Sequence, residues 1–133
     1  MKIEYLNDIS EGGRYANVVS DKLIRLFDFN ATQARRLQEI IKKAILDERG
    51  AVDLSSFEFI RSVNCNLVLQ IADANEGITT NDDYNFVCSL TIGNYEEMIA
   101  GIEPFCKPGV GGYQWLYDLD CSVDLLFSPG GTW

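Results

Sequence analysis

The chain has 133 residues, the usual size of one domain, and its 47% hydrophobic and 23% charged residues are typical of a globular protein rather than a disordered one. Eleven basic against twenty acidic residues give a net charge of −9, and such an acidic field repels phosphate, so nucleic acid is not an expected partner. The excess is uneven, because residues 1–61 hold ten basic and ten acidic residues, whereas residues 62–133 hold ten acidic residues and only Lys107.

The sequence has no run of about 18 apolar residues that would span a membrane. Its first residues, MKIEYLNDIS, contain Glu4 and Asp8 where a signal peptide needs an apolar stretch, so we expect a cytoplasmic protein. The cysteines are expected to be reduced and mostly buried, because they are not grouped in the closely spaced pairs of zinc sites and a chain of this size needs no disulfide framework. They are Cys65, Cys88, Cys106 and Cys121.

The first part of the chain predicts two strands followed by a helix. Residues 1–5 and 21–29 are expected to be strands. The second has apolar side chains on both faces, which indicates either a central strand covered on two sides or a strand covered by a partner. A helix then begins at Asn30, a good N-cap, with Gln33 as its capping-box partner. Gly50 ends this helix, whose apolar residues follow helical spacing and comprise Leu37, Ile40, Ile41, Ala44 and Ile45.

The second part predicts further strands and one more helix. Residues 52–62, 66–73 and 84–91 are expected to be extended, with turn chemistry at 74–77 and a polar stretch before residue 84. The second helix is expected to begin at Asn94 as N-cap and to end at Pro104, because apolar residues recur at 95, 98, 99 and 102. A flexible glycine-rich loop at 107–113, a short strand at 114–118 and a last strand at 121–127 complete the chain.

The order of the core elements is β-α-β-β-α-β, with an extra N-terminal strand. This order matches the ferredoxin-like plan, in which two helices cover one face of an antiparallel sheet. We therefore predict a single α+β domain over residues 1–133. A sheet of this kind often leaves its other face open, so a homodimer is a further expectation.

The chain contains no histidine. Its absence excludes Ser-His-Asp and Cys-His nucleophile systems, the HExxH zinc motif and histidine as a general base. No other catalytic motif is recognisable and no cofactor is expected, so an enzyme built on this sequence would have to use carboxylates or a cysteine.

The segment from residue 73 to residue 83 is rich in the oxygen ligands that calcium and magnesium prefer. It does not fit the EF-hand template, because Gly77 falls fifth rather than sixth and Tyr84 stands where a bidentate glutamate is needed. A solvated hairpin loop is the alternative interpretation. The weak candidates for a cation site are Asp73, Asn75, Glu76, Asp82 and Asp83.

Tyr113, Trp115 and Tyr117 recur at every second residue in and directly before the predicted strand at 114–118. If the chain is extended there, all three stand on one face. An exposed aromatic row binds a protein partner or stacks on a small ligand, whereas a buried one packs in the core. Trp133 follows a proline and two glycines, and it either folds back on its own domain or docks on a partner. These four residues are the predicted partner or ligand surface.

Three classes of function remain open. The favoured one is a non-enzymatic interaction or regulatory module whose acidic second half meets a basic protein partner, with the aromatic residues as apolar anchors. The second is a small-molecule or sugar-binding domain with its ligand between the sheet and the loop at 109–112. The third is an enzyme that uses carboxylates or a cysteine. Neither a nucleic acid nor a membrane is an expected partner.

Overall fold

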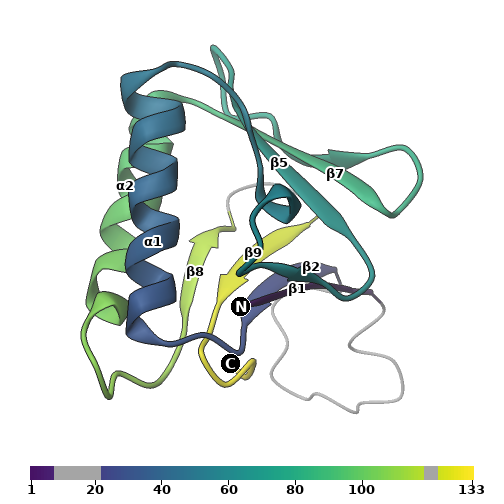
Figure 1. The fold of residues 1–133 in the computed structure, drawn as a ribbon. Helices are drawn as coiled ribbons and strands as arrows, with labels where there is room; N and C mark the ends of the chain where they lie inside the picture. The colour runs from purple at the N-terminus through teal and green to yellow at the C-terminus, as the bar shows by residue number, and fades with distance from the viewer. Residues whose placement is uncertain (8–21, 119–122) are drawn as a thin grey trace.

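The structure is a computed structural model that describes residues 1–7, 22–118 and 123–133. The described residues form a mixed α+β fold with two α-helices and two sheets (Figure 1). One sheet has five strands and the other has four, and both contain parallel and antiparallel pairs. None of the helices in these ranges is both long and apolar enough to cross a bilayer.

The five-stranded sheet, called sheet A here, has the strand order β4-β1-β2-β9-β8. Strand β2 is central, one of the two alternatives that its apolar residues on both faces indicated, and it pairs antiparallel with β1 and parallel with β9. The edge strand β8 pairs antiparallel with β9, and the short edge strand β4 pairs parallel with β1. The bounds are β1 Lys2–Leu6, β2 Leu23–Phe27, β4 Arg61–Ser62, β8 Gln114–Tyr117 and β9 Asp124–Phe127.

The four-stranded sheet, called sheet B here, has the order β3-β5-β7-β6. Strands β5 and β7 are parallel neighbours, and β6 lies antiparallel on the other side of β7. The prediction had no strand between residues 74 and 83, so β6 is a correction. The bounds are β3 Val52–Asp53, β5 Asn66–Ile71, β6 Gly77–Thr80 and β7 Asn85–Leu90.

Helix α1, Ala31–Ile41, begins as predicted. The Asn30 side chain accepts a hydrogen bond from the Gln33 amide, and the Gln33 side chain accepts one from the Asn30 amide, which satisfies two backbone donors that the helix leaves free. The helix continues as a π-helix, Lys42–Asp47, in which the Glu48 amide donates to the Lys43 carbonyl.

Helix α2, Ile92–Ile102, begins earlier than predicted. Thr91 is the N-cap, because its hydroxyl accepts from the Asn94 amide, so Asn94 lies inside the first turn instead of before it. The short 3₁₀ segment Glu103–Cys106 follows, and Pro104 ends the α-helical hydrogen bonding as expected.

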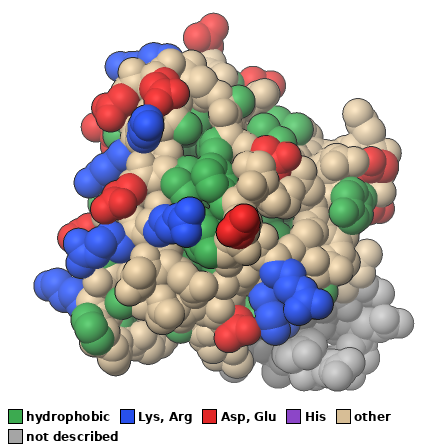
Figure 2. Space-filling view, in the orientation of Figure 1, with side chains coloured by type: hydrophobic (Ala, Val, Ile, Leu, Met, Phe, Trp, Pro, Cys, Tyr) green, Lys and Arg blue, Asp and Glu red, His purple; other side chains and the backbone are tan. Residues whose placement is uncertain are grey.

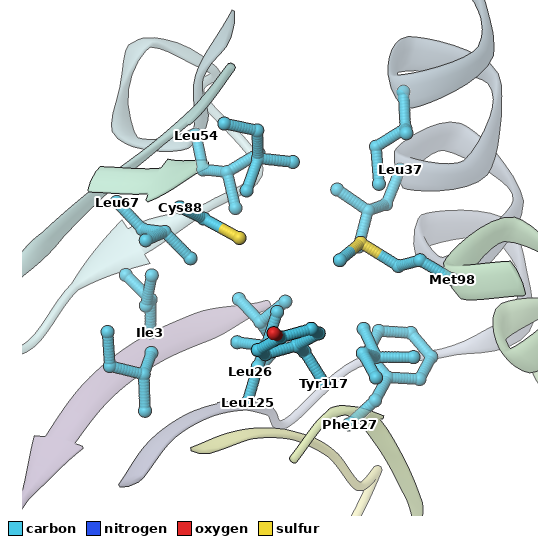
Figure 3. Packing of buried hydrophobic residues seen from close by; sticks show 14 of the residues in the cluster. Ile3, Leu26, Leu37, Leu54, Leu67, Cys88, Met98, Tyr117, Leu125 and Phe127 are labelled. Atoms are coloured by element: carbon cyan, nitrogen blue, oxygen red, sulfur yellow. The ribbon is translucent and has the colours of Figure 1, made fainter. Parts of the chain in front are cut away.

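The main core lies where the two sheets and the two helices meet. Figure 3 shows Ile3, Leu26 and Leu125 of sheet A pointing toward Leu67 of β5, with Leu37 of α1 and Met98 of α2 closing the third side. Tyr95 of α2 ties the helices to sheet B, because its hydroxyl donates to the carbonyls of Gln70 at 2.6 Å and Cys88 at 2.9 Å. Burial of Tyr95 raises the pKa of its hydroxyl far above the ordinary value, so it remains a donor.

The ferredoxin-like plan is not confirmed. Instead of one antiparallel sheet, the described strands form two mixed sheets, and the pair predicted as a hairpin, β5 and β7, is parallel. The physical reason is strand β6. The chain reverses after β5 to form β6 and reverses again to form β7, which lies between them and therefore runs parallel to β5. Figure 1 shows α1 and α2 side by side, and they contact one another.

Candidate functional site

The three aromatic residues at 113–117 do not form one row. The strand register shifts between Trp115 and Tyr117, and this irregularity turns Tyr117 into the main core, where it is 4% exposed. Leu116 is also buried and comes close to Gly101 of α2. Tyr113 is 49% exposed and meets Trp115 edge to face, with ring centres 6.3 Å apart. A shared face therefore remains only for Tyr113 and Trp115.

Trp115 and Trp133 both lie on the outer face of sheet A, the face turned away from the main core. Both are partly buried, and both pack against Leu23 and Leu126, which form a second, small hydrophobic cluster. Trp133 thus folds back on its own domain, one of the two alternatives that its sequence left open. This cluster holds the last residues of the chain against the strands.

Arg25 on β2 anchors the same end of the chain. Its guanidinium donates twice to a Glu4 carboxylate oxygen, at 2.6 and 2.9 Å, and once to the Gly131 carbonyl at 2.7 Å. The same group lies 4.1 Å from the centre of the Phe27 ring. Gly131 has a φ of 77°, and a Cβ there would stand 2.8 Å from Arg25 Nη1. This anchor was not predicted, although a lone arginine in an otherwise apolar strand was a signal for it in the sequence.

The five weak candidates for a cation site lie on both sides of β6 in the chain. Asp73, Asn75 and Glu76 precede the strand, and Asn75 already accepts a hydrogen bond from the Thr91 amide with its side-chain oxygen. Asp82 and Asp83 follow it. Within the part of the chain that the structure describes, no group of three or more acidic or cysteine side chains is placed to hold a metal ion. The cation site stays a prediction.

Asp82 organises the turn between β6 and β7. One of its carboxylate oxygens accepts from the backbone amides of Tyr84 and Asn85, and the other accepts from the Asn85 side chain. These hydrogen bonds lower the pKa of the Asp82 carboxyl to about 2, and the bond from the Asn85 backbone amide has the largest effect. Asp83 beside it adopts a left-handed backbone with a φ of 57°, which aspartate tolerates better than most residues. The Asp82 carboxylate therefore stabilises the turn between β6 and β7.

Most acids of residues 62–133 face solvent. Among the described residues of this part, eight acids are exposed and have no ion pair with any described residue. They are Asp73, Glu76, Asp82, Asp83, Glu96, Glu97, Glu103 and Asp118. Asp124 is buried, and Asp120 lies outside the described residues. Exposed carboxylates that no internal cation neutralises attract basic groups from outside.

The exposed large hydrophobic residues lie in the same part of the chain. The side chains of this kind that the described ranges expose are Val63 (49%), Tyr84 (50%), Val110 (37%) and Tyr113 (49%). Tyr84 directly follows Asp82 and Asp83, so an aromatic ring stands next to two acids at the tip of the β6–β7 hairpin. Only Tyr113 of these four was singled out from sequence.

The described cysteines, Cys65, Cys88 and Cys106, are buried, as expected, and they form no disulfide with one another. Burial raises the pKa of the Cys65 thiol to about 12, and burial also raises that of Cys106. A thiol of this kind carries almost no thiolate at neutral pH, which disfavours a cysteine nucleophile at these positions. Cys121 lies outside the described residues.

No protein-family model matches the chain, and a search of curated proteins finds no match either.

Proposed function

We propose that this chain is a non-enzymatic interaction domain that binds a basic protein partner through residues 62–133. One observation carries the proposal: eight exposed acids without an ion pair and the exposed large hydrophobic residues of the described ranges occur together in residues 62–133, where Lys107 is the only basic residue. Carboxylates of one sign steer a basic partner and speed its encounter, and nearby aromatic rings supply apolar contact.

The exposed face of α2 is the most regular part of this surface. Gly93, Glu96, Glu97 and Ala100 are exposed at helical spacing, whereas Tyr95, Met98 and Ile99 face the core. A stripe of two adjacent glutamates between small residues leaves room for long lysine or arginine side chains of a partner. Glu103 follows at the end of the helix and already accepts a hydrogen bond from Gln38.

Three buried cysteines that form no disulfide with one another fit a reducing compartment, so we also propose a cytoplasmic location.

Native mass spectrometry on the chain isolated gently from its source cells tests the proposal. We expect a co-purifying basic protein that dissociates when salt is raised. The double variant Glu96→Gln/Glu97→Gln should lose most of the bound partner. The control Glu39→Gln/Asp47→Asn removes the same number of charges from exposed positions of α1 and its π-helical extension. This variant should retain the bound partner.

Two results would contradict the proposal. One is a partner that is acidic or that binds equally well at high salt. The other is an equal loss of partner in the two double variants, since that would show an effect of net charge rather than of the α2 surface. A bare chain with a small extra mass would favour a ligand-binding domain instead.

A further inference from the structure

We draw no further inference here: the strongest candidate, the surface patch of hydrophobic side chains that lies next to α1 in Figure 2, is an apolar face, and nothing in the part of the chain that the structure describes shows what covers it.

Discussion

The charged residues of the two parts of the chain behave differently. Ion pairs join several charged residues of residues 1–61, with Arg25 and Glu4 2.6 Å apart, Lys2 and Asp28 3.2 Å apart, and Lys43 and Glu48 4.0 Å apart. In residues 62–133, the exposed acids that the structure describes have no ion pair with a described residue. The paired charges of the first part stabilise the fold, whereas we propose that the unpaired exposed acids of the second part bind a partner.

The largest effect is expected at Arg25. The change Arg25→Met keeps an apolar stem but leaves the Glu4 carboxylate, whose side chain is 19% exposed, without its partner and removes the bond to Gly131. Breaking a largely buried pair on one side is costly, so the free energy of unfolding should fall by about 2–3 kcal/mol in urea denaturation. The control Lys43→Met breaks an exposed 4.0 Å pair with Glu48 and should change it by less than about 0.5 kcal/mol.

A smaller effect is expected at Gly131. Alanine there needs a positive φ and places its Cβ 2.8 Å from the Arg25 guanidinium. Gly131→Ala should lower the free energy of unfolding by about 1–2 kcal/mol and increase the solvent quenching of tryptophan fluorescence as Trp133 is displaced. Its neighbour gives the control, because Gly130→Ala meets only Thr132 at 4.0 Å and should be nearly neutral. Equal behaviour of the two variants would argue against a clamped C-terminal segment.

Asp82 is the expected exception among the acids of the second part. Its pKa is about 2 in the folded chain, below the ordinary 3.8, so it stabilises the fold above pH 3.8 and this contribution is lost as pH falls through 2. Asp82→Ala should therefore lower the melting temperature at pH 7, and the difference from the parent chain should shrink as pH approaches 2. Asp73→Ala changes an exposed acid that forms no ion pair with a described residue, and it is the control. A difference that stays constant with pH would contradict the role of the carboxylate.

The smallest effect on stability is expected on α2. Glu96→Gln/Glu97→Gln removes two exposed charges without internal ion pairs, so the free energy of unfolding should change by less than about 0.5 kcal/mol. The sign should be stabilising at low salt, because repulsion within the acidic part is relieved. A clear loss of stability would mean that these glutamates stabilise the fold. The acids of the second part would then not differ in this respect from the paired charges of the first part.

The sequence was sufficient for elements that local signals specify. The capping box of Asn30 and Gln33 with its apolar stripe predicted α1, and alternating apolar residues predicted β5 and β7. Strand β6 was missed because Gly77, Thr79 and Thr80 are small or polar residues of an edge strand, which resemble a loop in the sequence. The division into two sheets depends on pairings between distant segments, for which a single sequence carries no local signal.

The candidate surface was predictable only in part. Counting residues shows that the second half is acidic, but it does not show which acids are exposed. Asp82 accepts backbone hydrogen bonds within its own turn, and Asp124 is buried. Tyr117 was expected beside Trp115, and the register irregularity between them, invisible in the sequence, turns it inward. The contact between Arg36 and Phe59 was also invisible in the sequence, because distant segments of the chain bring the two residues together.

The affinity of the isolated complex, measured at low and high salt by titration calorimetry, tests the central claim most directly. If exposed carboxylates of residues 62–133 hold a basic partner, the dissociation constant should rise about tenfold or more as salt screens the contact, and Glu96→Gln/Glu97→Gln should make the dependence shallower. A dissociation constant that does not change with salt, in the parent chain and the variant alike, would contradict the account.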